Sequence, residues 1–278
     1  MEKLSVTIIT YNEEKNIRDC LNSVKWADEI VVVDSFSTDK TVEICREYTD
    51  KVYQNKWHGF VEQKNFALSK ASHNWILSID ADERISGELG EEVRRILKDD
   101  TAYNGYYMPR KAFYVSNWIL HCGWYPDYKI RLFRKDKGGW EGAGGTPIHE
   151  SVKVEGRVGY LKGDLLHYSF RDISSHLKTI NTYTSISENE NFKRGKRGGI
   201  SMLLRPPVNF IKMYIIKGGF LDGLPGFIVS ALSSFHVFLK YAKMWEMKKE
   251  RQNKTQIFTD TRTRIITQRH KASKNKEY

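Results

Sequence analysis

Two carboxylates separated by one residue stand directly after an apolar run in this 278-residue chain. Residues 75–79, Trp-Ile-Leu-Ser-Ile, are typical of a buried strand, and Asp80, Ala81, Asp82 and Glu83 follow at once. Carboxylate oxygens are the hard ligands that Mg²⁺ and Mn²⁺ take when they bridge phosphates. A lone D-x-D is more often a pair of solvated turn residues, but beside a buried strand the two like charges would repel unless a cation were bound. The pattern therefore favours a site for Mg²⁺ or Mn²⁺.

Polar residues also follow two other apolar runs. Residues 4–10 and 29–34 are both typical of buried strands, and Tyr11 and Asp34 stand at their ends. In a parallel sheet, ligands bind beyond the carboxyl ends of the strands. There Asp34 can accept hydrogen bonds from a base or a ribose, whereas Tyr11 can either stack on a base or simply pack. Lys64, which opens a helical segment before the D-x-D strand, can neutralise a phosphate as a point charge.

The elements that carry these residues alternate between strand and helix. After the first strand, apolar residues recur at helical spacing, at Ile17, Cys20, Leu21 and Val24. The strands themselves are continuous apolar runs, which is typical of a parallel sheet covered on both faces. We therefore expect an α/β fold with a mainly parallel central sheet, a small antiparallel extension in the aromatic-rich residues 103–168, and a helical C-terminal appendage.

Two parts of the expected extension carry further candidates. Arg131 and Arg134 alternate with apolar residues, as on a half-exposed strand, where they can meet either acceptor phosphates or solvent. The glycines between residues 138 and 145 predict a flexible loop that ends at His149 and Glu150.

Charge is unevenly distributed along the chain. The 45 Lys and Arg outnumber the 34 Asp and Glu, for a net charge of +11, but residues 193–278 alone carry +14. A basic segment points to an anionic partner, either nucleic acid or an anionic membrane surface. The three cysteines form no C-x-x-C pair, which argues against a disulfide scaffold or a cysteine zinc site and favours a reducing compartment.

Residues 206–241 mix apolar segments with lysines. The cleanest apolar run, 227–239, is shorter than the ~20 residues of a membrane-spanning helix. Helices lying in the plane of a membrane surface fit this pattern, and an ordinary helical cap on the core is the alternative. The expected organisation is therefore a catalytic domain over 1–192, membrane-associating helices over 193–247 and a basic, disordered tail over 248–278.

Four segments together resemble one enzyme family. They are the strand followed by TYNEE, the strand followed by VDSFSTDKT, the Lys64-Asn65 pair and ILSIDADE. The set resembles glycosyltransferase family 2, whose members have the GT-A nucleotide-sugar-binding fold, over residues 4–170. Three later segments, RLFRKD, IHE and LLHYSF, are similar to its lipopolysaccharide core glucosyltransferase-like branch.

The resemblance implies roles for individual residues. A nucleotide-sugar would contact Thr10, Tyr11, Glu13, Asp34, Lys64 and Asp80. Among these, Asp34 would meet uracil and Asp80 the ribose or phosphate. A divalent cation would be held by Asp82 and a downstream histidine, for which His167 is the best match and His149 the rival.

Glu150 would be the catalytic base, although the family usually has a Glu-Asp pair where this chain has His149-Glu150. The implied reaction is an inverting transfer of a hexose, glucose or another, from a nucleotide-sugar, UDP-linked as the first choice. The acceptor would be membrane-linked, with lipopolysaccharide core the leading candidate and a polyprenyl-phosphate carrier the second. The expected location is cytoplasmic, peripheral on the inner face of the cytoplasmic membrane.

Two other functions fit the sequence less well. A sugar nucleotidyltransferase also needs a metal-binding carboxylate, but the acidic TYNEE stands where its glycine-rich phosphate loop would be expected. A nucleic-acid-binding protein would use the basic C-terminal part, but the acidic residues 80–83 oppose phosphate binding without a metal. No nucleic acid is therefore expected as a partner.

Overall fold

The structure is a computed structural model that describes residues 2–99, 101–142, 150–193 and 201–274. The chain divides into two compact units. The sheet unit comprises Met1–Ile173 and Lys217–Gly226, and the helical unit comprises Ser174–Ile216 and Phe227–Tyr278. The division thus falls nearly twenty residues before the domain boundary that the sequence analysis places at 192, because the helix that follows the last strand belongs with the helical unit.

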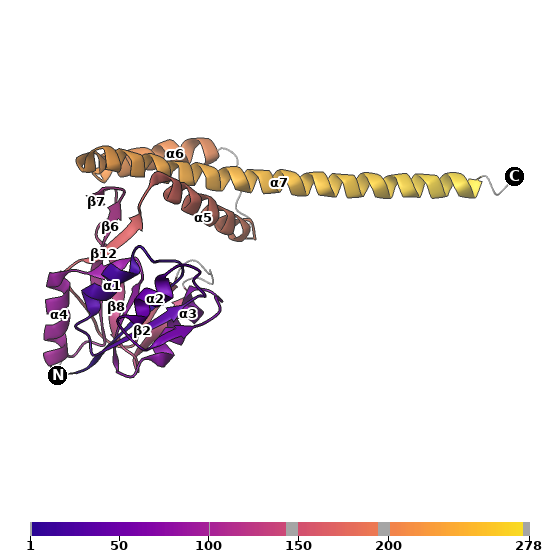
Figure 1. The fold of residues 1–278 in the computed structure, drawn as a ribbon. Coiled ribbons are helices and arrows are strands. Elements are labelled where there is room, and N and C mark those ends of the chain that lie inside the picture. The colour runs from indigo at the N-terminus through magenta and orange to yellow at the C-terminus, as the bar shows by residue number, and fades with distance from the viewer. Residues whose placement is uncertain (1, 100, 143–149, 194–200, 275–278) are drawn as a thin grey trace. The chain divides into compact units, whose positions relative to one another are not determined.

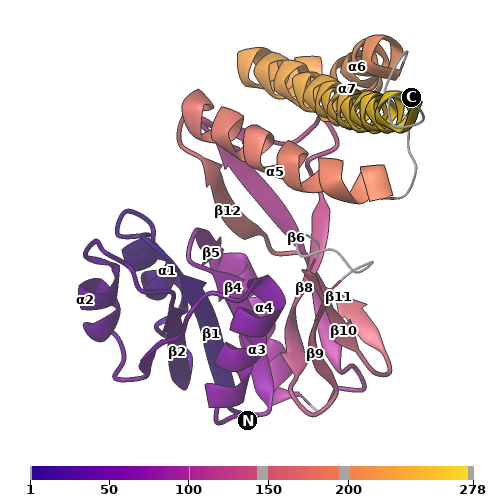
Figure 2. The same ribbon diagram turned by 90° about the vertical axis from the view of Figure 1, so that its right-hand side faces the viewer.

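Four parallel strands form one half of the main sheet; β2 is labelled in Figure 1, and β1, β2 and β4 are labelled in Figure 2. They lie in the order β3-β2-β1-β4, and their bounds are β1 Leu4–Thr10, β2 Glu29–Asp34, β3 Val52–Gln54 and β4 Trp75–Asp80. In this register Thr10 pairs with Asp34, and Ile9 pairs with Asp80. The polar residues at the three strand ends therefore reach the same edge of the sheet, as the sequence predicts.

Helices cover both faces of the parallel half. Even-numbered β1 residues such as Leu4, Val6 and Ile8 pack in one buried cluster with helices α1 and α4, whereas Ile9 packs in another cluster with Ala67 of α3. Ser86 caps α4, since its Oγ accepts a hydrogen bond of 3.2 Å from Leu89 N, as the sequence predicts. The helices are α1 Ile17–Val24, α2 Thr41–Arg46, α3 Phe60–Lys70 and α4 Gly87–Lys98.

The other half of the sheet is mixed (Figure 2). Strand β8 (Asp127–Arg134) runs antiparallel between β4 and β6 (Gly105–Tyr114), and β12 (Leu165–Phe170) runs parallel to β6 and antiparallel to β5 (Glu83–Ile85). Two short strands, β7 (Asn117–Ile119) and β11 (Val158–Tyr160), also pair with β6. The predicted α/β fold with a mainly parallel centre and an antiparallel extension is confirmed.

The segment predicted as a flexible glycine loop begins as a strand. Strand β9 (Gly138–Gly142) pairs with β10 (Glu150–Val154) in a separate two-stranded antiparallel sheet. A Cβ on Gly138 would lie 3.0 Å from the carbonyl oxygen of Lys153 and 3.1 Å from the Phe133 ring. Gly138 therefore permits close packing of the strand, and the glycine signal there reflects a tight contact and not a loop.

The helical unit contains α5 (Ile173–Lys193), α6 (Ser201–Ile211), a π-helical turn η2 (Lys212–Ile216) and most of α7 (Gly223–Lys274). A 3-10 turn, η3 (Gly219–Asp222), precedes α7 and belongs to the sheet unit. The segment from residue 248, which the sequence predicts to be a disordered tail, is helical as far as Lys274. No glycine or proline interrupts residues 227–274, and Lys, Arg and Gln favour helix.

Candidate active site

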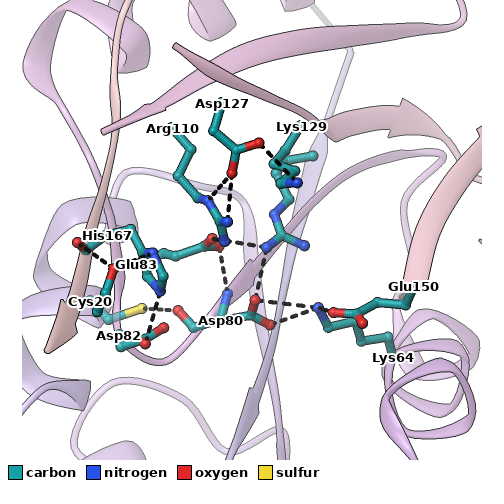
Figure 3. Close-up of polar contacts among 12 residues, drawn as sticks. Cys20, Lys64, Asp80, Asp82, Glu83, Arg110, Asp127, Lys129, Glu150 and His167 are labelled. Carbon is teal, nitrogen blue, oxygen red and sulfur yellow. Dashed lines mark hydrogen bonds and ion pairs between the residues drawn. The ribbon is translucent and has the colours of Figure 1, made fainter. Parts of the chain in front are cut away.

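The D-x-D turn is fixed by its own neighbours (Figure 3). It joins the end of β4 to the start of β5, and the Asp80 amide donates a 3.0 Å hydrogen bond to Glu83 Oε2. Tyr168 N donates to the Asp82 carbonyl oxygen at 2.9 Å, and the buried Cys20 thiol donates to the Asp80 carbonyl oxygen at 3.6 Å. These three contacts fix the backbone of the turn at Asp80 and Asp82.

Asp82 lies against His167, the two residues that the family resemblance implies as ligands of a divalent cation. His167 Nε2 is 3.2 Å from Asp82 Oδ2, because the β5–β12 pairing places His167 opposite Glu83. Ser169 Oγ lies 2.7 Å from His167 Nδ1 and so orients the ring with Nε2 toward Asp82. The rival histidine, His149, lies outside the described residues.

The side chains of Asp82 and His167 fit a divalent cation whose remaining ligands come from a substrate. Within the described part of the chain, no three His, Cys, Asp or Glu side chains group closely enough to hold a metal by themselves. One or two protein ligands completed by phosphate oxygens is the usual arrangement for Mg²⁺. Asp82 supplies a carboxylate oxygen, which suits Mg²⁺ or Mn²⁺, and His167 supplies an imidazole nitrogen, a ligand typical of transition metals and so better matched to Mn²⁺ than to Mg²⁺.

Lys64 joins two of the predicted carboxylates. Its Nζ lies 2.9 Å from Asp80 Oδ1 and 3.2 Å from Glu150 Oε1, and the side chain is buried. The ammonium also sits 4.2 Å from the centre of the Trp140 ring, where the π face stabilises a cation. Residues from α3, β4 and β10 thus meet at one point, and a cation lies between the candidate donor-binding acid and the candidate base (Figure 3).

Arg131 is a site residue whose role the sequence analysis missed. One Arg131 nitrogen, Nη2, lies 2.8 Å from both Asp80 Oδ2 and Glu83 Oε1, and the side chain is buried. The interpretation of Arg131 as a half-exposed residue facing solvent or acceptor phosphate is therefore wrong. Glu83 is fully buried as well, and Arg110 approaches its Oε1 at 3.5 Å. In the sequence, the signal for a buried cation such as Arg131 is Glu83, a third acid beside the D-x-D that needs a positive partner when it is buried.

Lys64 and Arg131 fix the charge of Asp80. Burial by itself raises the pKa of a carboxyl, but Lys64 and Arg131 outweigh it and hold the pKa of Asp80 well below its usual range. Burial by itself would lower the pKa of Arg131, but the negative charges of Glu83 and Asp80 outweigh burial and raise that pKa. Asp80 is therefore an anion, and Arg131 a cation, throughout the neutral range.

The predicted nucleotide-contacting residues lie at the ends of β1 and β2. Asp34 is buried, and its carboxylate accepts hydrogen bonds from Ser37 N at 2.8 Å and from Ser37 Oγ. Thr10 pairs with Asp34 in the sheet register, and Tyr11 is exposed. The structure thus brings Thr10 and Asp34 to one edge, and it shows that Asp34 also braces its own loop.

Glu13 lies in the turn after β1, beside the metal-binding candidate. Burial and then the negative charge of Asp82 raise the pKa of Glu13, whereas a 2.7 Å hydrogen bond from Asn16 Nδ2 acts in the opposite direction. Arg171 Nη2 in turn donates to Asn16 Oδ1 at 2.7 Å. The carboxyl of Glu13 therefore belongs to the same electrostatic environment as the D-x-D turn.

Comparison with known proteins identifies the family of this site. Residues 5–146, just over half of the chain, match the model of glycosyl transferase family 2. This chain belongs to glycosyl transferase family 2. The predicted family and the predicted glycosyltransferase activity are thereby confirmed.

Two relatives and one solved structure cover most of this family 2 chain. A lipopolysaccharide core biosynthesis glycosyltransferase of Rhizobium meliloti is 30% identical, covering 87% of this chain and 92% of the relative. An uncharacterized glycosyltransferase of Rickettsia typhi is 33% identical, covering 91% and 90%. The crystal structure of S. aureus TarS residues 1–349 is 17% identical with a TM-score of 0.44, covering 87% and 91%.

Proposed function

We propose that this glycosyltransferase moves a hexose from a UDP-linked sugar to a membrane-linked saccharide, with inversion at the anomeric carbon. The observation that carries the proposal is the position of Lys64 between Asp80 and Glu150, beside the Asp82–His167 pair. This arrangement offers cationic and metal-binding groups for a diphosphate and a carboxylate for an acceptor hydroxyl within one small region.

The donor side of the reaction requires compensation of a leaving diphosphate. Asp82 and His167 would hold a divalent cation, which supplies Lewis-acid stabilisation of the charge that develops on the departing nucleoside diphosphate. Lys64 contributes a second positive charge from a buried position, where the interaction is stronger than in water. Thr10, Tyr11, Glu13 and Asp34 would line the nucleotide, and Asp80 would contact its ribose or phosphate.

The acceptor side requires a base, because a sugar hydroxyl is a poor nucleophile at neutral pH. Glu150 would take the proton of that hydroxyl as it attacks, an effect typically worth about 10²–10⁴-fold in rate. Lys64 Nζ lies 3.2 Å from Glu150 Oε1, and this contact would hold the carboxylate in place for the reaction. Attack from the side opposite the leaving group would invert the anomeric centre.

The acceptor proposal rests on the relative and on the chain's own chemistry. The Rhizobium meliloti relative is named for lipopolysaccharide core biosynthesis, which supports a lipopolysaccharide core acceptor here. The C-terminal part of the chain is basic, and among the residues that the structure describes one helical segment, Gly219–Arg251, is long and apolar enough to cross a membrane by length and composition alone. We place the enzyme in the cytoplasm, peripheral on the inner face of the cytoplasmic membrane.

A donor screen tests this function. Purified full-length chain would be heated with UDP-, GDP- and dTDP-sugars, with and without Mn²⁺ or Mg²⁺, because a ligand of the native state raises the melting temperature. We expect one UDP-hexose to give the largest shift, only with the cation, and to release UDP slowly. NMR of the product formed with lipopolysaccharide core would report the anomeric configuration. If no sugar nucleotide shifts the melting temperature or is turned over, the proposed function is wrong.

A further inference from the structure

The helical unit exposes an unusual amount of apolar surface on α6 and the π-helical turn η2. The exposed fractions reach 65% for Leu203, 64% for Val208 and 76% for Ile216. Leu204, Ile211 and Ile215 are also more than half exposed. Soluble monomers rarely leave a contiguous apolar surface of this kind uncovered, so these residues mark a contact surface.

Helix α7 continues this apolar surface on one side only. Its exposed aromatic residues recur at helical spacing and are Phe227, Phe235, Phe238 and Trp245. Val229, Ser230 and Met244 of the same helix are buried. Helix α7 therefore has an inward face that packs in the protein and an outward apolar face.

A groove of about 400 Å³ runs between α6 and α7. Leu203, Pro207 and Phe210 line it from α6, and Phe235 and Phe238 line it from α7. The groove and the exposed residues together form what we call the α6–α7 apolar face. Apart from Ser234, its lining is apolar, which suits an alkyl chain.

The charges along this face select an anionic partner. Residues 201–216 and 227–245 contain no Asp or Glu, and their charged residues are Arg205, Lys212, Lys240 and Lys243. Of these, Lys243 donates hydrogen bonds to Asn181 and Ser185 of α5, so the argument from charge rests on the other three. In a symmetric dimer, the same patch meets its own copy, so these cations would face cations. An anionic lipid headgroup layer over hydrocarbon complements both the charge and the apolar side chains.

The one-sided burial of α7 distinguishes two ways of entering a bilayer. A spanning helix needs an apolar surface along ~20 residues that lipid can surround. Helix α7 instead packs Val229, Ser230 and Met244 inward and presents a stripe outward. That pattern is typical of a helix that lies in the plane of the interface with its apolar face sunk among the acyl chains.

We infer that the α6–α7 apolar face is a membrane-docking surface that lies in the plane of an anionic bilayer, with lipid acyl chains filling the groove. The inference rests on the proposed function for its biological setting, since a lipid-linked acceptor requires the enzyme at a membrane. It goes further in naming the surface, its orientation and the lipid charge that it selects.

Vesicle flotation of the full chain tests this surface. We expect binding to vesicles of phosphatidylcholine mixed with phosphatidylglycerol, at least tenfold tighter than to phosphatidylcholine alone and weakened by salt, because each basic residue near the surface adds attraction. Val208→Glu and Ile215→Glu should each weaken binding about tenfold or more, because a carboxylate would enter the interface. Tyr160→Glu is the matched control, since Tyr160 is an exposed apolar residue of the sheet unit.

Three results would overturn the inference. The first is equal flotation of Val208→Glu and wild type. The second is resistance of the bound protein to extraction with alkaline carbonate, which would indicate a spanning helix. The third is a dimer that forms without lipid and that Val208→Glu dissociates, which would indicate that a second copy of the chain covers the face. Circular dichroism of each variant would show that the helices persist. The UDP-hexose melting shift, measured on the same samples, separates the two proposals: its absence with flotation intact refutes the donor chemistry and leaves the surface supported.

Discussion

His167 Nε2 lies 3.2 Å from Asp82 Oδ2, although the two residues are 85 positions apart in the chain. Strand β12 pairs with β5 directly after the D-x-D turn, and this pairing creates the contact. Because Ser169 holds the other ring nitrogen, the geometry prepares an imidazole and a carboxylate to face one ion. The metal proposal therefore predicts measurable effects for three side chains and not only for the aspartate.

Loss of the Asp82 charge should weaken the cation site. We expect Asp82→Asn to reduce Mn²⁺ affinity in the presence of UDP by at least about tenfold, and Ser169→Ala to reduce it by about 10–100-fold through loss of the ring's partner. Isothermal titration calorimetry would measure both. The control is Asp50→Asn, which removes the same charge at an exposed position outside the proposed site. Unchanged Mn²⁺ affinity in Asp82→Asn would remove this residue from the metal site.

Glu150→Gln separates base catalysis from donor binding. The amide oxygen of Gln can still accept a hydrogen bond from Lys64, so the contact between Lys64 and residue 150 should persist. Gln, however, cannot take a proton from the acceptor hydroxyl. We expect kcat to fall about 10²–10⁴-fold while UDP-sugar affinity changes less than about threefold. The control is Glu141→Gln on the paired strand β9, whose side chain is largely exposed. A normal kcat in Glu150→Gln would place the base elsewhere.

Arg131 should act through Asp80 and Glu83, as a positioning residue. Arg131→Met leaves the buried Glu83 and the partly buried Asp80 short of a cation, and we expect about 3–5 kcal/mol of destabilisation in urea unfolding. Adding Glu83→Gln should recover part of the loss, which a double-mutant cycle would quantify. The control is Arg18→Met, which breaks an exposed ion pair with Glu47 and should destabilise the protein far less.

Activity of a stable variant distinguishes positioning from stability alone. Arg131→Lys keeps the positive charge but cannot reach both carboxylates in the same planar geometry. We expect it to raise KM for the donor with a folded protein at the assay temperature. If Arg131→Lys keeps wild-type kcat and KM, Arg131 supports the fold and not the position of Asp80.

Much of the fold could be predicted from local pattern. The strands at residues 4–10 and 29–34 match the structure residue for residue, because buried parallel strands are continuous apolar runs with polar residues at their ends. The same signal indicates the D-x-D turn, whereas Lys64 lies in helix α3 and is indicated only by its positive charge in the segment before the D-x-D strand. The joining of Asp82 to His167 came from the family resemblance, since pairing between β5 and β12 leaves no local signal.

Contacts between distant strands explain what the sequence did not reveal. Arg131 alternates with apolar residues on β8, and that pattern is the same whether its outward side faces water or a buried acid. Its burial follows from the place of β8 between β4 and β6, which only the sheet order determines. The Gly138–Gly142 strand was missed because glycine serves both flexible loops and close packing, and here Lys153 and Phe133 crowd the backbone.

Glu29 gives a prediction on stability that is independent of the active site, since it begins β2 at the opposite end from Asp34. Burial alone would raise the pKa of Glu29, but hydrogen bonds from Lys51, Ser5 and Ser72 outweigh it and lower the pKa from 4.5 to about 2. A carboxyl with a depressed pKa stabilises the fold above its unfolded pKa, and this stabilisation is lost as the pH falls from about 4.5 to about 2.

Because Lys51 is 42% exposed and water screens its charge, the depressed pKa of Glu29 corresponds to roughly 1–2 kcal/mol of folding free energy at neutral pH. We therefore expect wild type to exceed Glu29→Gln in stability by about that amount at pH 7 and the difference to shrink steadily below pH 4.5. Urea unfolding at several pH values measures it, and Glu43→Gln, exposed on α2, corrects for the change in net charge. A difference that grows on acidification would have the wrong sign, and would show that the Lys51, Ser5 and Ser72 contacts do not stabilise the ionised form.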